Sequence, residues 1–574
     1  MSIKMFNDKC VINYLLIFFS LIVVNTAVSQ NFDPPYPRVG QVYFYNPGQG
    51  AEIWKDHDLI IIRHKYNDEA RKIKAKNPDV ILLATNDYIV SKKDMWPDAW
   101  YVKDSNGKMT SYHEDYGLMN ITNQCPRVNH TYGSQRFNEF LPRHLMEKTD
   151  YNYFDGTFFD YWAKQLWGSK PDRADITNDN KPDGAQYVNQ EWEKGNQMLI
   201  SNLRALLNKP VAAHEAGQTY LNGNGFEFWP NLSRKNTLED LFELEDQAVK
   251  PVINFAEGYG YEKGPDFGSN WRADFMTSQI GGAYFGHDEG TTAHRFTFLH
   301  DEFEADLGHP LPGSAGDPLE IMSGVYARYF DKGAIIANVS GNSKTVQSSH
   351  LDGRGYWRFR GAQDPGFNNG QQFTSVSFSG NDGIMLFTEP TTLVTPIIID
   401  NVKVNMTSLD QSPAQYTGNW TQVRWYGEAD KSKTGYALGL SWGSEQYTYV
   451  FSTGAGEARY QPKINVSGKY EIFEWHPDVS RDDNGSPCSN VKLSVVSADG
   501  TTEKTIDQSV NYGKWNSLGV YNFNTGTSGH VVLKAPGGCT ASSDAIQFVS
   551  YDPNSQVVDT HPPDRPRGIK VESN

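Results

Sequence analysis

Short apolar runs alternate with charged, helix-forming segments along the first 340 residues of the chain. Several runs, such as Val80 to Asn86, are apolar at consecutive positions, which is typical of parallel strands buried on both faces. Eight segments are predicted to be strands: Gln41 to Asn46, Leu59 to His64, Val80 to Asn86, Thr157 to Asp160, Pro210 to Glu215, Val249 to Ala256, Gly282 to Gly286 and Ala334 to Asn338. Helical patterns lie between them at Asn67 to Lys76, Phe137 to Lys148 and Glu191 to Leu207. The alternation predicts a (β/α)8 TIM barrel over residues 30–340.

A doubly wound parallel sheet is the alternative fold. It is disfavoured because no Gly-rich phosphate loop follows the first predicted strand.

The periodicity changes after Ser340, where short alternating segments are separated by Gly, Asn and Asp turns. This pattern predicts a small β-sandwich over residues 341–406, packed on the barrel, and a second β-sandwich over residues 407–551. The polar, Pro-rich residues 552–574 are predicted to form a disordered tail.

The first 29 residues have the pattern of a secretory signal peptide. Lys4 and Lys9 precede an apolar run, Val11 to Val24, and the small residues Ala27 to Ser29 follow as a cleavage site. We therefore expect a secreted protein, extracellular or periplasmic, with no membrane insertion. The net charge of −16 also argues against nucleic acid as a partner.

The chain contains four cysteines, and an exported protein can form disulfides between them. Cys10 lies in the leader and Cys125 stands alone, whereas Cys488 and Cys539 fall within the same β-rich region. We expect these last two to form a disulfide and Cys125 to be a buried, unreactive thiol.

The segment Tyr151 to Trp162, YNYFDGTFFDYW, carries the most informative chemistry. In a barrel of this type, residues at the carboxyl ends of strands line the functional site. Asp160 is therefore predicted to face that site, while Asp155 marks the start of the strand. Carboxylates at strand ends, together with tryptophans in the following loops, favour glycoside hydrolysis. The tryptophans are Trp162, Trp167, Trp229 and Trp271.

Glycoside hydrolysis needs a second carboxylate, and spacing alone does not select one. The candidates that follow predicted strands are Glu215, Glu227, Glu257, Asp288 and Glu289. Other polar or aromatic residues near strand ends are predicted to contact substrate, and these are Tyr45, Asn86 and His287.

No metal or other cofactor is expected. The histidines between His287 and His309 match no zinc spacing. The segment Asp175 to Gly184 resembles a calcium loop, but Lys181 occupies a position that should hold an oxygen ligand, which favours a solvated turn.

Two regions resemble known families. Residues 38–390, through FDGTFFDYW, the Leu221-Asn-Gly segment with Phe226-Glu227, and YARYFDKGAIIANVSG, resemble a TIM-barrel glycoside hydrolase-like group. The resemblance implies Asp160 and Glu227 as the catalytic pair. His214-Glu215 departs from the plainer Asn-Gly strand end of that group, which keeps Glu215 a candidate.

The C-terminal region is similar to the golvesin C-terminal-like domain, which also occurs on proteins of the xanthan lyase type. The matching motifs are GKYEIFEW (468–475), Asp507-Gln508, WNSLG (515–519) and Ser543-Asp544-Ala545.

The sequence thus predicts a glycoside hydrolase acting on a polysaccharide or oligosaccharide. Two other classes stay open. A polysaccharide lyase would need a Tyr or His base, for which Tyr161 and His287 are candidates, and a non-catalytic glycan-binding protein would depend on the C-terminal domain.

Overall fold

The protein is described from a computed structural model. The structure describes residues 30–44, 57–87, 89–166, 171–214, 217–228, 233–258, 268–287, 300–361, 364, 366–390, 397–401, 409–424, 448–464, 466–477, 486–511 and 515–551. Among these residues, no helix combines the length and the apolar character needed to cross a membrane.

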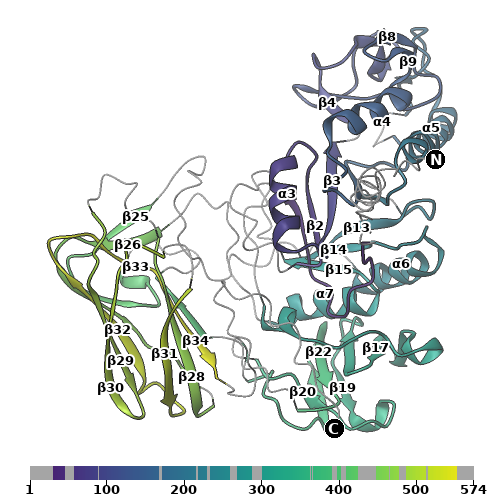
Figure 1. The fold of residues 1–574 in the computed structure, drawn as a ribbon. Coiled ribbons are helices and arrows are strands. Elements are labelled where there is room, and N and C mark those ends of the chain that lie inside the picture. The colour runs from purple at the N-terminus through teal and green to yellow at the C-terminus, as the bar shows by residue number, and fades with distance from the viewer. Residues whose placement is uncertain are drawn as a thin grey trace, which may run out of the picture. The chain divides into compact units, whose positions relative to one another are not determined.

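Eight parallel strands form the central sheet (Figure 1). In spatial order they are β1 (Gly40–Phe44), β2 (Leu59–Arg63), β3 (Ile81–Asp87), β10 (Gly156–Asp160), β12 (Val211–His214), β13 (Gly223–Phe228), β14 (Phe255–Gly258) and β15 (Tyr284–His287). A parallel bridge between Val39 and Phe285 joins the first and last strands of this order. The sheet is therefore a nearly closed parallel barrel, as the alternating pattern predicts.

One predicted barrel strand is wrong. The segment 334–338 belongs to β18 (Gly333–Asn338), which pairs antiparallel with its neighbours in a separate sheet. Its place in the barrel is taken by β13, where Gly223 and Gly225 weaken the strand pattern. Both glycines are sterically required, because a Cβ would lie 1.8 Å from the Ile253 carbonyl oxygen at Gly223 and 2.9 Å from the Phe158 ring at Gly225.

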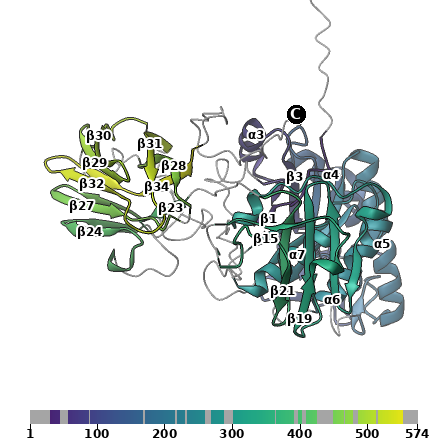
Figure 2. The ribbon, with the colours of Figure 1, turned by 90° about the horizontal axis from the view of Figure 1, so that it is seen from below.

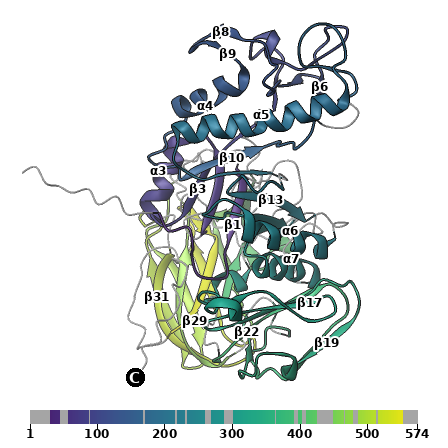
Figure 3. The ribbon, with the colours of Figure 1, turned by 90° about the vertical axis from the view of Figure 1, so that its right-hand side faces the viewer.

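Five helices connect the described barrel strands: α3 (Asn67–Lys76), α4 (Phe137–Lys148), α5 (Ala185–Leu206), α6 (Arg234–Gln247) and α7 (Ser269–Ile280). The predicted bounds of α3 and α4 are confirmed, and α5 begins six residues earlier than predicted. All residues of α7 from Trp271 to Ile280 are buried, so this part of the helix has no polar face for a sequence pattern to reveal. Helices α4 and α5 run side by side (Figure 3).

Alternate residues of the barrel strands pack in separate clusters. One cluster fills the barrel interior with a residue from nearly every strand: Val42, Leu59, Ile61, Ile81, Leu83, Phe158, Ala212, Ile253, Phe255 and Tyr284. The intervening residues of β2 and β3 instead pack against Ala70 and Ile73 of α3 on the outside. The apolar residues of β15 divide in the same way, with Tyr284 inside and Phe285 outside against α7. This division identifies which residues of these strands face the barrel interior.

Small strands occupy the segment between β3 and α4 and the loop after β10. They are β4 (Val90–Lys92), β5 (Lys103–Asp104), β6 (Ser111–His113), β7 (Tyr116–Leu118), β8 (Val128–His130), β9 (Gly133–Gln135) and β11 (Ala174–Asp175). Strands β4, β7 and β6 form one sheet, and β11 pairs with β5. Val90 of β4, Leu118 of β7 and Ala174 of β11 share a core with α4 and α5.

A five-stranded antiparallel sheet follows the barrel in sequence, in the order β16 (Leu319–Met322), β17 (Val325–Phe330), β18, β22 (Asp382–Phe387) and β20 (Trp357–Arg358). A two-stranded sheet, β19 (Lys344–Gln347) with β21 (Ser375–Phe378), accompanies it. Arg272 of α7 donates to Asp382 of β22 at 2.9 and 3.1 Å and to Asp364 at 2.8 Å. This sheet begins about twenty residues before position 341, because it includes β16 to β18.

The C-terminal region contains three antiparallel sheets. Figure 2 shows the first two, and Figure 1 labels the strands of the third. The first contains β23 (Ile397–Asp400), β34 (Ala545–Ser550), β28 (Gly468–Trp475) and β31 (Trp515–Phe523). The second contains β24 (Gln415–Gly418), β27 (Ala455–Tyr460), β32 (His530–Pro536), β29 (Val491–Ser497) and β30 (Gly500–Ile506), and the third β25 (Thr421–Arg424), β26 (Thr448–Ser452) and β33 (Ala541–Ser543). The first two sheets contribute to one hydrophobic cluster. Because β23 pairs with β34, this unit begins before position 407.

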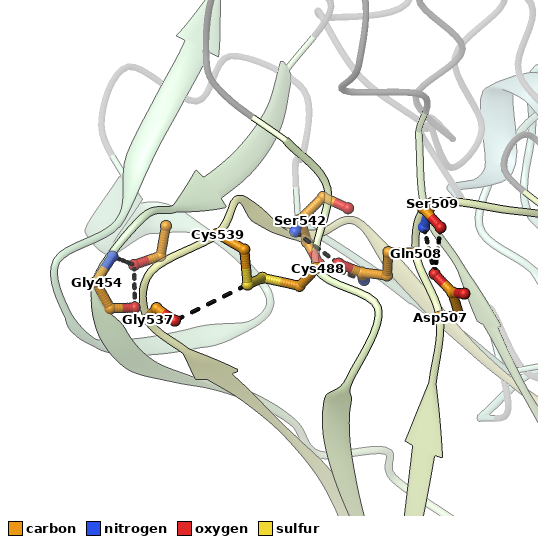
Figure 4. Close-up of a disulfide and its surroundings, with 9 residues drawn as sticks. Gly454, Cys488, Asp507, Gln508, Ser509, Gly537, Cys539 and Ser542 are labelled. Carbon is orange, nitrogen blue, oxygen red and sulfur yellow. Dashed lines mark hydrogen bonds between the residues drawn. A yellow bond between two sulfur atoms is a disulfide. The ribbon is translucent and has the colours of Figure 1, made fainter.

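A disulfide joins Cys488 to Cys539, as expected (Figure 4). Cys125 is a buried free thiol, also as expected. Gln508 lies beside the disulfide, and its backbone N–H donates to the Cys488 carbonyl oxygen at 2.9 Å. The Gln508 side chain bonds the backbone of Ser542, accepting from its N–H at 2.9 Å and donating to its carbonyl oxygen at 2.8 Å. Gln508 thereby ties the disulfide to β33.

The Gln508 amide also donates to the buried carboxylate of Glu474 at 3.2 Å. The same carboxylate lies 2.9 Å from Nδ1 of His476, and Nε2 of His476 lies 3.0 Å from the Val510 carbonyl oxygen. Burial by itself lowers the pKa of His476, but Glu474 and the carbonyl outweigh it, so the pKa is raised. Since both ring nitrogens face acceptors, the surroundings of His476 in the C-terminal unit favour its imidazolium form.

The disulfide is predicted to stabilise the C-terminal unit. Cys488 and Cys539 are 51 residues apart, and releasing a loop of that length costs about 4 kcal/mol in the chain-entropy account. The double variant Cys488→Ser/Cys539→Ser should lower the free energy of unfolding of this unit by up to that amount in chemical denaturation. Cys125→Ala is the control for cysteine loss elsewhere. Unchanged stability of the C-terminal unit in the double variant would show that the bridge is dispensable.

Candidate active site

The interior face of the barrel ends in polar side chains at its carboxyl edge. Asp160 lies two residues beyond Phe158, His214 two beyond Ala212, and Glu257 two beyond Phe255, each continuing an interior-facing row. On β13, the interior position Gly225 is followed two residues later by Glu227. On these four neighbouring strands, three acidic residues and one histidine therefore occupy interior-row positions at the same end of the barrel.

Asp160 is the last residue of β10 and is largely buried, with a side chain 11% exposed. The chain turns sharply after it, because Tyr161 adopts a positive φ of 53°. The Tyr161 backbone N–H donates to Oδ1 of Asp160 at 2.7 Å, and Nδ1 of His214 lies 3.7 Å from the same oxygen. The backbone N–H orients the carboxylate and stabilises negative charge on it.

Asp87 and Arg63 belong to the same edge but were missed by sequence reasoning. Asp87 is the register partner of Asp160 on the adjacent strand β3, at an interior position four residues beyond Leu83. The Arg63 guanidinium, at the end of β2, donates to Oδ2 of Asp87 at 3.4 Å. Both side chains are partly exposed, 26% for Arg63 and 32% for Asp87. A sequence signal was available, since Arg63 is the penultimate residue of one predicted strand and Asp87 directly follows another.

Glu227 and Glu257 are register partners on β13 and β14. Glu257 is almost fully buried, with 1% of the residue exposed. Asp160 is two strands away from β13, which corresponds to a lateral backbone separation of roughly 10 Å.

Asp155, at the opposite end of β10, has a structural role. Its Oδ2 accepts from the Leu82 backbone N–H at 2.8 Å and lies 2.7 Å from Nζ of Lys74. The carboxylate thus joins β10 to β3 and to helix α3. This agrees with its expected place at the start of the strand.

Two predicted substrate-contacting residues lie on the outer face of the barrel. Asn86 is two residues beyond the outward-facing Ala84, and His287 is two beyond the outward-facing Phe285. Both point away from the interior edge that carries Asp160. The neighbouring Asp87 takes the interior position that Asn86 was expected to occupy.

The tryptophans expected near the site are buried where the structure describes them. Trp162 is 4% exposed, packs in the cluster with α4 and α5, and donates to the Gln218 side chain at 2.5 Å. Trp271 is 1% exposed and lies in α7. Other predicted site residues lie outside the described part of the chain: Tyr45, Trp167, Glu215, Trp229, Asp288 and Glu289. For Glu227 the backbone is described, but its side chain is not.

His287 is part of a buried histidine pair outside the barrel. Its Nδ1 lies 2.7 Å from Nε2 of His300, and the His300 ring stacks on Trp271 with centroids 3.7 Å apart. Burial lowers the pKa of His287 to about 3, and burial together with the neighbouring His287 lowers that of His300 well below its ordinary value. Both imidazoles are therefore neutral at physiological pH.

The segment that resembles a calcium loop forms a closed turn. The Asp175 carboxylate accepts from the backbone N–H groups of Asp179 and Asn180 at 3.1 and 2.7 Å, and Asp183 accepts from that of Ile176 at 2.7 Å. Asn178 and Asn180 adopt positive φ, which favours such a turn. Across the described residues, no group of three or more His, Cys, Asp or Glu side chains could hold a metal ion.

Comparison with known proteins gives a family match for the C-terminal region. Residues 404–550 match the Golvesin C-terminal domain family. The chain is also similar to the xanthan lyase of Bacillus sp. (strain GL1), with 28% identity over 134 residues. These residues are 21% of this chain and span only 14% of the lyase.

Two solved structures are similar to longer parts of the chain. The isomalto-dextranase of Arthrobacter globiformis T6, solved with panose, has 10% identity and a TM-score of 0.30, covering 89% of this chain and 96% of that one. The glycoside hydrolase domain of PelA from Pseudomonas aeruginosa has 9% identity and a TM-score of 0.27, covering 45% of this chain and 96% of that one.

The buried histidine pair is predicted to make the fold sensitive to acid. His287 has an ordinary pKa of 6.5 when unfolded and about 3 when folded, so its contribution is complete above pH 6.5 and is lost as pH falls toward 3. Each such proton changes the free energy of unfolding by up to about 1.4 kcal/mol per pH unit. His287→Gln should flatten this decline in urea titrations between pH 6.5 and 4, whereas His350→Gln, at an exposed histidine, should not. An identical decline in all three proteins would contradict the assignment.

Proposed function

We propose that the protein hydrolyses glycosidic bonds of a polysaccharide or oligosaccharide at the carboxyl edge of the barrel. The observation that carries the proposal is the row of interior positions ending in Asp160, Glu227 and Glu257. This reaction typically requires two carboxyl groups that flank the sugar linkage to be cleaved.

In the proposed reaction, one carboxylic acid gives its proton to the glycosidic oxygen while the bond from that oxygen to the anomeric carbon breaks. The second group, as a carboxylate, either takes a proton from the attacking water or bonds the anomeric carbon before water releases it. The two sugar products together contain the atoms of the substrate and of one water molecule. Asp160 and Glu227 are the proposed pair, with Glu257 beside Glu227 as the alternative partner or a substrate contact.

The division of the chain follows from this assignment. Catalysis is proposed for the barrel, while residues from β23 to β34 form a β-sandwich accessory domain that contributes stability or weak glycan attachment. The disulfide and the leader-like segment support export of the protein. Residues 1–29 and 552–574 keep their proposed roles as signal peptide and tail.

A polysaccharide lyase is supported less well by the site. The histidine considered as its base, His287, lies on the outer face of β15 and hydrogen-bonds His300. The lyase similarity covers only 21% of the chain. The carboxylates at the interior edge therefore favour hydrolysis.

Removal of the paired carboxylates should abolish most turnover. Asp160→Asn and Glu227→Gln are each expected to lower kcat at least about a hundredfold, because acid-base assistance is worth that much. The measurement is release of reducing ends from whichever polysaccharide of a panel the unsubstituted protein cleaves. Glu257→Gln tests whether Glu257 replaces Glu227 in the pair.

Asp155→Asn is the matched control within the same strand. It removes the partner of Lys74, so it should cost about 3–5 kcal/mol of stability while leaving kcat of the folded protein near normal. A near-normal kcat for Asp160→Asn would instead remove Asp160 from the mechanism.

Loss of the C-terminal unit should leave catalysis intact. A chain that ends within residues 391–396 retains the barrel and the sheet from β16 to β22 but lacks β23 and all later strands. We expect its activity on short soluble oligosaccharides to stay within a few-fold of the full chain, because no barrel carboxylate is removed. Circular dichroism first establishes that the shortened chain is folded. A folded truncation without activity would place part of the active site in the C-terminal unit.

A further inference from the structure

Four charged or titratable side chains form a row across consecutive strands at the interior edge. Arg63 on β2 contacts Asp87 on β3 at 3.4 Å, and His214 on β12 lies 3.7 Å from Asp160 on β10. Asp87 and Asp160 are register partners in the middle of the row. The order along the edge is therefore cation, carboxylate, carboxylate, imidazole.

The two central carboxylates disfavour each other's charge. Register partners on adjacent parallel strands have backbones about 4.8 Å apart, and both side chains point to the interior. Two ionised carboxylates at such spacing repel strongly unless opposite charges lie close by. Arg63 supplies a permanent charge on the Asp87 side, whereas the corresponding position beside Asp160 holds a histidine, which can lose its charge.

We propose that His214 is a positioning residue for Asp160, and that its imidazolium form holds this carboxylate ionised and oriented for catalysis. The inference deepens the proposed hydrolytic function and rests on it for its catalytic meaning. Oδ1 of Asp160 accepts from the Tyr161 backbone N–H at 2.7 Å and lies within ion-pair distance, 3.7 Å, of His214 Nδ1. Both interactions favour the anion, so Asp160 is the nucleophile or base of the pair and the proton donor is a glutamic acid on β13 or β14.

Several other groups bear on the charge of His214. Among the described positions of the interior edge, Asp160 and Asp87 lie on one side with Arg63 beyond them. Glu227 and Glu257 follow on the other side, along β13 and β14. Acidic residues outnumber the single arginine among these positions, so the surroundings favour the protonated imidazole, and Oδ1 of Asp160 lies 3.7 Å from its Nδ1.

Kinetics distinguish positioning from a purely structural role. His214→Gln should lower kcat about tenfold with little change in KM. The substitution removes a positive charge that acts on the reacting carboxylate of Asp160 rather than on the substrate. His214→Lys keeps a cation that remains charged at higher pH, so it should recover part of kcat and extend activity to more alkaline pH. Equal losses in both variants, with an unchanged pH profile, would contradict the proposal.

The decisive test needs no substrate. In the full-length protein, the imidazole of His214 is titrated by nuclear magnetic resonance and assigned from the signal that His214→Gln removes. The titration midpoint should fall by about one pH unit or more in Asp160→Asn, since an opposite charge at this distance is worth that much. Asp87→Asn is the matched control, and it should shift the midpoint by less than half as much.

An unchanged midpoint in Asp160→Asn, or an equal shift in Asp87→Asn, overturns the pairing. Asp160→Ser serves the same comparison if the asparagine variant does not give a native spectrum. Because the titration runs without a glycan, a failed search for hydrolytic activity would count against the proposed function and not against the coupling of His214 to Asp160.

Discussion

The side-chain alternation of eight parallel strands decides where every other feature of the barrel lies. Residues such as Leu83, Phe158 and Phe255 fill the interior, and the intervening residues pack against helices outside. Because side chains alternate with a period of two residues, a one-residue shift of a strand exchanges the residues on its two faces. The interior packing therefore fixes which polar residues meet at the carboxyl edge, and Asp160 is among them as a direct continuation of the row through Phe158.

This constraint also explains how far the sequence could be interpreted. Helices with a polar face, such as α3 and α4, were predicted with correct bounds, whereas α7, buried on all sides, was not. Strands buried on both faces give apolar runs without alternation, so the sequence indicated that β3 ends near the site but not which residue faces it. The sequence pattern predicts that Asn86 contacts substrate, whereas Asp87 holds the interior position in the structure. For the same reason the sequence predicts that His287 faces the site, whereas it lies on the outer face of the barrel.

Charge and burial separate structural from functional groups within this one chain. Asp155 directly precedes β10 and Asp160 is its last residue. Asp155 accepts from the Leu82 backbone N–H and pairs with Lys74, while Asp160 lies beside an imidazole at the barrel edge. The buried histidines divide similarly. The pKa of His287 is lowered by burial, and that of His476 is raised because its Glu474 partner outweighs burial. Neutral His287 therefore stabilises the fold above its unfolded pKa, and charged His476 does so below its folded pKa. Neither needs a catalytic explanation.

The central claim is that water, acting through carboxylates at the interior edge, cleaves a sugar linkage. Mass spectrometry of products formed in ¹⁸O-labelled water tests it most directly. Hydrolysis predicts that each new reducing end carries one ¹⁸O atom, introduced during cleavage, and that no unsaturated sugar forms. Products that lack the label and absorb in the ultraviolet would identify elimination instead, and would contradict the assignment of Asp160 and its glutamate partner to hydrolysis.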